Sequence, residues 1–296
     1  METKSSNLQI FKSSNLIFLL TLFTLTINAA TPVVAPDYSE KSLIAPEYFG
    51  PNAFPVPPML NGVNDSTLNF FVGLDEQYAR TGKTQYGNEG ERTTTIQAHL
   101  SIPLFTQRVN LRVWMPVMEF YNNTNFGSGH GAGDVYISTD IQILNQRKYI
   151  PAIQLRAAMK TASGDQYEKY RFYDSPGYFF DLAVAKSFSI SHAWLIHLAA
   201  SAGFLCWQTG NGRQNDAVMF GLSAQLRHTY FSLNAQYAGY IGWENAGDRP
   251  MVVRTIMKGH INNFEPLIAY EYGIKDYPFH TLRAGLRYHI NIGIKH

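Results

Sequence analysis

A histidine and a serine two positions apart form the side-chain pair that most resembles a catalytic one. His99 and Ser101 lie on one face of an extended segment, because alternate residues of a β-strand point to the same side. A serine nucleophile needs a histidine base within hydrogen-bond reach and a third group that orients this base. Asn110 is the nearest candidate for that third group, but pairing through the intervening turn places it opposite Pro103. We therefore expect no enzyme, and an acyl-chain hydrolase is the least favoured function.

Metal, cofactor and nucleic-acid sites lack their characteristic patterns in this sequence. The chain has a single cysteine, Cys206, which excludes an intrachain disulfide and a multi-cysteine zinc or iron–sulfur site. Its 24 basic and 22 acidic side chains leave a net charge of +2, without the concentrated basic face that nucleic acids require. No nucleotide-binding glycine pattern is present. Five histidines are too dispersed for metal-ligand spacing: His130, His192, His228, His260 and His280. The sequence predicts no metal, no cofactor and no nucleic-acid partner.

The first 30 residues have the organisation of a secretory signal peptide. Lys4 and Lys12 precede an apolar stretch over residues 16–27, and the small residues Ala29 and Ala30 follow it. This stretch is shorter than the ~20 residues that a membrane-spanning helix requires. A basic start, a short apolar core and a small-residue end are typical of export signals. We expect residues 1–30 to direct export, with the cleavage position left open; a buried core helix is the alternative.

Residues 31–65 form a proline-rich leader that holds half of the 14 prolines in the chain. This proline content excludes a regular helix or a central strand. Apolar side chains such as Tyr48, Phe54 and Leu60 are too numerous for an inert linker. We expect the leader to enter the folded body as a plug or to lie against it in the periplasm. A partly ordered tail is the alternative.

The remaining residues, 66–296, alternate between apolar and polar side chains with a period of two. Ile96, Leu100 and Leu104 lie on one side of a segment whose other side carries Gln97 and His99. Such alternation is typical of strands with two unlike faces. Each segment reaches the ~9–11 residues of a membrane-crossing strand. We predict twelve strands, at about residues 67–79, 93–105, 108–121, 133–145, 148–161, 177–190, 192–207, 216–228, 229–243, 250–260, 263–275 and 278–293.

The connections between these strands are sorted by length. They are long and polar after the first, third, fifth, seventh and ninth strands, as in residues 80–92, 122–132 and 162–176, and short after even-numbered strands, as in residues 106–107. The exception is the connection at residues 276–277 after the eleventh strand, which is short where a long one is expected. Such sorting is typical of outer-membrane barrels with both termini in the periplasm, whose closure leaves no bare strand edge in lipid. We therefore predict an all-β fold, a transmembrane up-and-down antiparallel β-barrel. A soluble lipocalin-like barrel or a two-sheet sandwich would place the same apolar residues inside.

In a membrane barrel the apolar strand faces contact lipid and the polar faces enclose the lumen. Aromatic residues near strand ends then form two girdles, among them Tyr78, Phe105, Phe120, Tyr121, Tyr149, Tyr178, Phe188, Tyr240, Trp243, Phe264 and Tyr288. The lumen receives Asp75 and thirteen further candidates: Arg112, Asp134, Asp140, Arg156, Lys160, Asp181, Arg227, Arg254, Lys258, Glu265, Glu271, Arg283 and Arg287. Because both signs are nearly balanced, we expect either mutual pairing or a narrow aqueous path with a charged constriction, and no single-sign selectivity ring.

Two stretches resemble landmarks of a known family. Residues 129–137, Gly-His-Gly-Ala-Gly-Asp-Val-Tyr-Ile, resemble the Gly-x-Gly-Asp strand opening of the outer-membrane family associated with the meta-pathway of phenol degradation. Residues 151–165 are similar to its second landmark, an apolar strand that runs into a Lys-Pro-Thr-Gly-type loop, although residues 161–164 lack the proline. The resemblance implies a barrel with an uptake role for small, often hydrophobic molecules. For Asp134 we favour a structural role, in which its carboxylate binds loop amides, over a ligand site.

These features predict an outer-membrane channel or facilitator for the passive diffusion of small molecules, hydrophobic or aromatic ones among them. The alternative is a non-conducting structural or interaction barrel that displays the loops at residues 122–132 and 162–176. We expect the protein in the outer membrane of a Gram-negative bacterium. Its expected partners are outer-membrane lipids, the barrel-assembly machinery and a small-molecule solute. The residues indicate neither the identity of the solute nor the oligomeric state.

Overall fold

The structure is a computed structural model that describes residues 55–79, 91–104, 108–123, 127–165, 176–208, 214–243, 248–276 and 278–291. All of these residues belong to one compact unit, Pro36–His296. The predicted signal peptide, the first part of the leader, the connection at residues 80–90 and the girdle residue Phe105 lie outside the described residues. Within the described ranges, no helix has the length and apolar character needed to cross a membrane.

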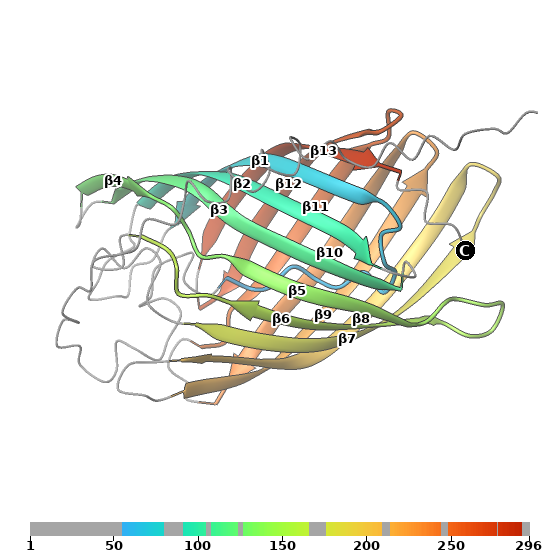
Figure 1. Cartoon of the computed structure of the whole chain (residues 1–296), viewed down its shortest axis with the longest axis horizontal. Helices are drawn as coiled ribbons and strands as arrows, with labels where there is room; N and C mark the ends of the chain where they lie inside the picture. The colour runs from blue at the N-terminus through green and yellow to red at the C-terminus, as the bar shows by residue number, and fades with distance from the viewer. Residues whose placement is uncertain are drawn as a thin grey trace, which may run out of the picture. The chain divides into compact units, whose positions relative to one another are not determined.

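Thirteen β-strands make up the described fold (Figure 1). In chain order they are β1 (Leu68–Ala79), β2 (Glu91–Leu104), β3 (Val109–Asn123), β4 (Gly127–Gly131), β5 (Tyr136–Leu144), β6 (Ala152–Lys160), β7 (Gly177–Ser189), β8 (Trp194–Gln208), β9 (Gln214–His228), β10 (Phe231–Gly242), β11 (Met251–Gly259), β12 (Phe264–Lys275) and β13 (Phe279–Ile290). β4 and β5 both pair with β3, at its residues 119–123 and 109–114, so they share one position in the sheet.

The sheet closes because its first and last strands pair with each other. β1 pairs antiparallel with β13, from Leu68 opposite Ile290 to Ala79 opposite Phe279, and with β2 on its other side. The remaining neighbours are antiparallel as well. The predicted closed antiparallel barrel with twelve strand positions is thereby confirmed. Closure leaves no bare strand edge, which lipid could not satisfy with hydrogen bonds.

The two faces of each strand differ as the alternation predicts. In β7, Phe179, Asp181 and Ala183 are buried, whereas Phe180 and Leu182 between them are exposed. The exposed set along the other strands is rich in Leu, Ile, Val and Phe, and the buried set holds most of the charged and amide side chains. This is the face arrangement of a transmembrane barrel, in which apolar side chains contact acyl chains.

One predicted loop is wrong in part. Residues 122–132 were expected to form a long connection, but β3 extends to Asn123 and β4 occupies Gly127–Gly131. The alternate glycines of β4 suggest a loop, yet their lack of side chains suits close packing on β3. A Cβ added to Gly129 would lie 2.3 Å from the hydroxyl oxygen of Tyr121. The glycines therefore let this short strand pair closely with its neighbour.

A bulge in β3 changes which residues face the interior. The register between β2 and β3 shifts at Ile96 and Gln97, and strict alternation fails on β3 beyond this point. Asn110 is buried before the bulge, whereas Glu119 and Tyr121 are buried after it. Strict alternation misses Glu119 for this reason.

The predicted aromatic girdles also need correction at two positions. Tyr121 and Tyr240 are 4% and 0% exposed, so they lie inside the barrel and cannot contact an interface. The other described girdle residues are exposed, with Tyr149 and Trp243 the most exposed of them. Proximity to a strand end is therefore insufficient, because the side of the strand decides where an aromatic ring points.

Candidate functional site

The predicted lumen residues occupy inward-facing positions of eight strands and of the connection between β4 and β5. Arg112 lies on β3, Asp140 on β5, Arg156 and Lys160 on β6, Asp181 on β7, Arg227 on β9, Arg254 and Lys258 on β11, Glu265 and Glu271 on β12, and Arg283 and Arg287 on β13, while Asp134 lies between β4 and β5. All are buried or half-buried except Arg227, which is exposed near the end of β9. They alternate with apolar residues on the outer face.

Strand register joins these charges into ion pairs. Arg156 lies directly opposite Asp181, Asp75 opposite Arg283, and Arg254 opposite Glu271. The nitrogen–oxygen distances are 2.7 and 2.8 Å for Arg156 with Asp181, 2.6 and 2.5 Å for Arg283 with Asp75, 2.9 Å for Arg254 with Glu271, and 3.0 Å for Arg112 with Asp140. The first three pairs make fork-like, two-contact interactions that fix the orientation of both partners.

Because these ion pairs are buried, the loss of one partner should lower the stability of the barrel. The side chains of Arg156 and Asp181 are 3% and 1% exposed, and the guanidinium carbon of Arg156 lies 4.9 Å from the centre of the Phe179 ring. Removal of one partner from a buried ion pair costs about 3–5 kcal/mol, whereas replacement of both by apolar residues is often neutral. The pairs therefore hold the inner wall in a defined geometry, and add little net stability.

Basic groups exceed acidic ones where β11 ends and β12 begins. The Oε1 atom of Glu265 lies 3.0 Å from the Lys258 ammonium and 2.9 Å from the Arg287 guanidinium, and its Oε2 atom is 3.7 Å from His260 and 3.9 Å from His289. Burial lowers the pKa of His260, which lies in the turn after β11, and the Glu265 carboxylate opposes this shift. One carboxylate thus neutralises only part of the charge of its basic neighbours.

The two stretches with family resemblance contact each other at Asp134. Its Oδ1 atom accepts a 2.7 Å hydrogen bond from the Gly164 amide, and its Oδ2 atom lies 2.7 Å from the Lys160 ammonium, which is fully buried. Gly133 donates to the Pro116 carbonyl, and a Cβ at Gly133 would lie 2.5 Å from the Pro116 ring. Asp134 therefore joins the start of β5 to the end of β6, in agreement with its structural interpretation.

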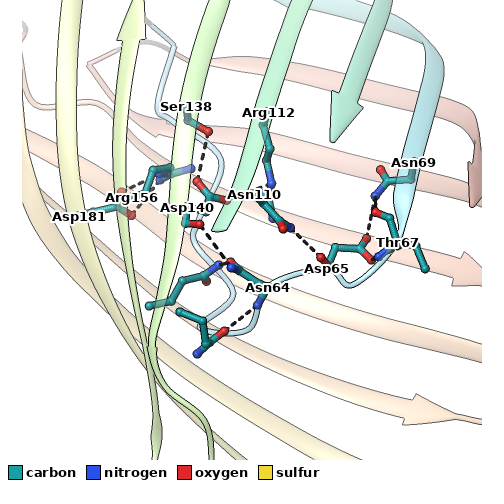
Figure 2. A network of polar contacts seen from close by, with 12 residues as sticks. Asn64, Asp65, Thr67, Asn69, Asn110, Arg112, Ser138, Asp140, Arg156 and Asp181 are labelled. Carbon is teal, nitrogen blue, oxygen red and sulfur yellow. Dashed lines mark hydrogen bonds and ion pairs between the residues drawn. The ribbon is translucent and has the colours of Figure 1, made fainter. Parts of the chain in front are cut away.

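Residues 55–67, which include the end of the leader, contact the inner wall of the barrel. Val56 and Leu60 are 6% and 1% exposed, and hydrogen bonds connect the segment to β3, β5, β6, β8 and β11. Figure 2 shows Asn64 and Asp65 between the inner strand faces. The Asn64 side chain donates to the carbonyl oxygens of Arg108 and Asp140 at 2.7 and 3.3 Å. Its amide oxygen accepts a bond from Gln154.

The first described residues of this segment enter an aromatic cluster. Val56 packs in one buried cluster with Tyr136, Phe179, Trp207 and Tyr240. The rings of Trp207 and Tyr240 are 5.6 Å apart, and partly buried Trp114 stacks on Tyr136 at 5.0 Å. Sequence reasoning missed this cluster: it assigned Tyr240 to the girdles and did not bring the other rings together. Residues two positions apart on a strand point to the same side, and Trp207 lies two positions after Leu205, which is buried. This spacing is the signal that could have placed such a ring inside the barrel.

The possible catalytic pair has no triad geometry. Asn110 lies opposite Pro103, as predicted, and its side-chain amide donates to the Asp65 carbonyl at 2.8 Å. The His99 ring instead packs edge-on against Phe71, with 4.8 Å between ring centres. Among the described residues, no three His, Cys, Asp or Glu side chains come together as a possible metal site. The described interior is therefore a wall of ion pairs and amides that surrounds an internal segment.

Comparison with known proteins relates this chain to outer-membrane barrels through its fold. No protein-family model matches the chain, and no curated protein does either. An outer membrane channel from Pseudomonas putida F1 is 11% identical, with a TM-score of 0.55, and the match covers 80% of this chain and 100% of the channel. The translocator domain of the autotransporter NalP from Neisseria meningitidis is 11% identical over 77% of this chain and 90% of that domain, with a TM-score of 0.45. The NanC porin is 10% identical, with a TM-score of 0.43, and the match covers 74% of this chain and 100% of the porin.

Proposed function

We propose that this protein is an outer-membrane channel through which small molecules diffuse passively. The observation that carries the proposal is the closed barrel with an apolar exterior and an interior lined by charged and amide side chains. Such an interior can solvate a polar path, and the exterior suits lipid. The barrel from Pseudomonas putida F1, which is a channel, shares this fold. Outer-membrane lipids, the barrel-assembly machinery and a small-molecule solute are the partners that this proposal requires.

In this proposal the thirteen charged lumen candidates line the path, and the leader closes it in the resting state. The support is the set of contacts that residues 55–65 make with opposite walls. Arg254 on β11 and Asn110 on β3 both bind the segment, so it lies between them. A solute can pass only when this segment moves aside. The leader of residues 31–65 thus acts as a plug in the proposed mechanism.

A preference for hydrophobic or aromatic solutes is the finer part of the proposal. The side chain of Val56 lies among Tyr136, Phe179, Trp207 and Tyr240. Aromatic rings offer large apolar contact surfaces to small hydrophobic molecules. When Val56 withdraws, these rings are free to contact a solute of similar size. The charged wall farther along the lumen then governs how such a solute leaves.

A non-conducting barrel that displays its loops is the second candidate. The buried pairs Arg156–Asp181 and Lys160–Asp134 favour it, because fully paired charges contribute to a packed interior as readily as to a water path. In that case residues 55–67 serve as permanent core, and the protein functions through its long connections. The two functions differ in one measurable property, which is ionic current through the purified protein.

A substitution at Gly62 should displace the segment without removal of any part of the chain. Gly62 has φ of +79°, which costs an L-residue about 1–2 kcal/mol, and a Cβ there would lie 2.3 Å from the Ala185 Cβ. Gly62→Ala should therefore expel the segment from this wall. Gly127 has a similar φ of +75° with nothing within 4 Å of an added Cβ. Gly127→Ala is thus a matched control for backbone strain alone.

The test is single-channel recording in planar lipid bilayers with the wild type and both variants. We expect small or rare current steps in the wild type and in Gly127→Ala, and larger or more frequent steps in Gly62→Ala. Folding of each variant is checked by its heat-modifiable mobility on gels. If folded Gly62→Ala carries no current, the display function is correct. If the wild type already conducts at the level of Gly62→Ala, the segment is no plug.

A further inference from the structure

The inner wall binds the leader segment mainly through its backbone. Four side chains from four different strands donate hydrogen bonds to main-chain carbonyl oxygens of residues 56–65. The bonds are Arg254 to Val56 at 2.6 Å and to Pro57 at 3.2 Å, His197 to Asn61 at 2.9 Å, Gln142 to Gly62 at 3.0 Å, and Asn110 to Asp65 at 2.8 Å. Carbonyl oxygens are common to every peptide, so these contacts depend little on the side chains of the bound segment.

These donors are oriented by the wall itself, independently of the segment. Glu271 holds the Arg254 guanidinium through two contacts of 2.9 Å. Ser187 bonds the Nδ1 atom of His197 at 2.8 Å, and its hydroxyl can donate there, which leaves the Nε2 proton to point at the segment. Gln142 also donates to the carbonyl oxygen of Ile153. Arg254, His197 and Gln142 therefore remain in place when the segment leaves, which is the preorganisation expected of a binding site.

Small wall residues let a peptide backbone approach between the donors. Ala152, Ala185 and Ala199 form a buried apolar cluster against which Met59 of the segment packs. On the neighbouring strand, a Cβ added to Gly221 would lie 3.0 Å from the Met59 sulfur atom. The wall thus combines small apolar residues on β6–β9 with the polar donors around them. This combination suits a peptide chain, whose backbone can approach the small wall residues closely.

We propose that this wall is a binding site for an extended peptide, which residues 56–65 occupy in cis and which a separate peptide can occupy when they withdraw. The segment bends at Gly62 and Val63, so its ten residues span less than the about 33 Å of a fully extended chain. Asn64 adds side-chain recognition, through its bonds to Gln154 and to two wall carbonyls. The ligand class is therefore a short peptide with an exposed row of carbonyl oxygens and one amide side chain. The inference rests on the proposed channel only in requiring that the segment can move.

The probe is a fluorescently labelled synthetic peptide with the sequence of residues 55–66, Pro-Val-Pro-Pro-Met-Leu-Asn-Gly-Val-Asn-Asp-Ser. Its anisotropy is measured with full-length wild type and Gly62→Ala in detergent micelles. We expect Gly62→Ala to bind the peptide at least about 10-fold more tightly than the wild type, whose site is already filled. A peptide with alanine in place of the residue matching Asn64 should bind more weakly. If Gly62→Ala does not fold, Asn64→Ala replaces it as the weakened full-length chain.

A second substitution tests whether the wall donors are responsible. In the Gly62→Ala background, His197→Phe removes one donor while it keeps an aromatic ring, and affinity should fall about 2–10-fold, as for the loss of one hydrogen bond. Gln97→Ala, an inward-facing change on β2, which supplies none of these donors, is the control and should leave affinity unchanged. Absence of peptide binding to folded Gly62→Ala, or an unchanged affinity in His197→Phe, would overturn the inference. Current without peptide binding refutes the peptide site alone, and peptide binding without current refutes the channel alone.

Discussion

The contact between Lys160 and Asp134 offers a quantitative test of the interior. The Lys160 ammonium is 0% exposed and lies 2.7 Å from the Asp134 carboxylate, which also accepts the Gly164 amide. Asp134→Asn keeps an acceptor for that amide but removes the negative charge 2.7 Å from the ammonium. Because removal of one partner from a buried ion pair costs about 3–5 kcal/mol, we expect a decrease of that size in the free energy of unfolding. Lys160→Met should cost about 3 kcal/mol, since it leaves the carboxylate buried.

The double variant separates pairing from burial. With both charges removed, the free energy of unfolding should return to within about 1–2 kcal/mol of the wild type, because a buried ion pair offers little net stability over uncharged residues. The coupling energy between the two substitutions should therefore be about 3 kcal/mol or more. It is measured by urea denaturation in detergent micelles, followed by tryptophan fluorescence and by heat-modifiable gel mobility.

An exposed pair provides the matched control. Arg92 and Glu76 also form a direct ion pair, but their side chains are 72% and 37% exposed. The same cycle with Arg92→Met and Glu76→Gln should show a smaller coupling, because these side chains are exposed on the outer face of the barrel and no interior packing encloses them. A coupling at the Lys160–Asp134 pair no larger than at this exposed pair would refute the reasoning that burial governs the strength of the inner wall.

Two further predictions concern the outer face and the turn after β11. Leu222→Arg, at an exposed position near the middle of β9, should lower the free energy of unfolding in lipid by about 2–4 kcal/mol. Gln225→Arg on the inner face of the same strand should cost less, and equal costs in lipid bilayers would contradict the orientation of the faces. Burial lowers the pKa of His260 below its ordinary value of 6.5, so the unfolded chain takes up this proton first as pH falls. Stability should therefore decrease as pH falls below 6.5 towards the lowered pKa. His260→Gln should remove this part of the pH dependence of the thermal midpoint. If the pH profile of the variant equals that of the wild type, the pKa of His260 is not lowered.

The strand pattern was predictable because the side chains on each face of a strand match the surroundings of that face. Phe180 and Leu182 alternate with Phe179 and Asp181, and lipid on one side with a polar interior on the other is sufficient to produce that order. The number of strand positions follows from repeating this pattern along the chain. The alternation failed where local geometry changed, as at the β3 bulge that brings Glu119 inside and at the glycine strand β4.

The partners of the charged residues required the structure. Asp134 and Lys160 are separated by 26 positions, and only the register of β5 and β6, with the turn at Gly164, brings them together. The charge types were visible in the sequence, and mutual pairing was one of two predicted outcomes. Which acid contacts which base depends on strand register, and register is set by the turns and by the packing of all neighbours at once.

By itself, the sequence determined that this chain forms strands with one apolar and one polar face, because side-chain direction alternates within each strand wherever it folds. Only the tertiary structure decided what lies inside. The bond between Arg254 and Val56 joins residues 198 positions apart, and the bond between Asn64 and Gln142 joins residues 78 apart. Such contacts form only after the barrel closes around the segment, since they depend on the shape of a cavity that no single strand encodes.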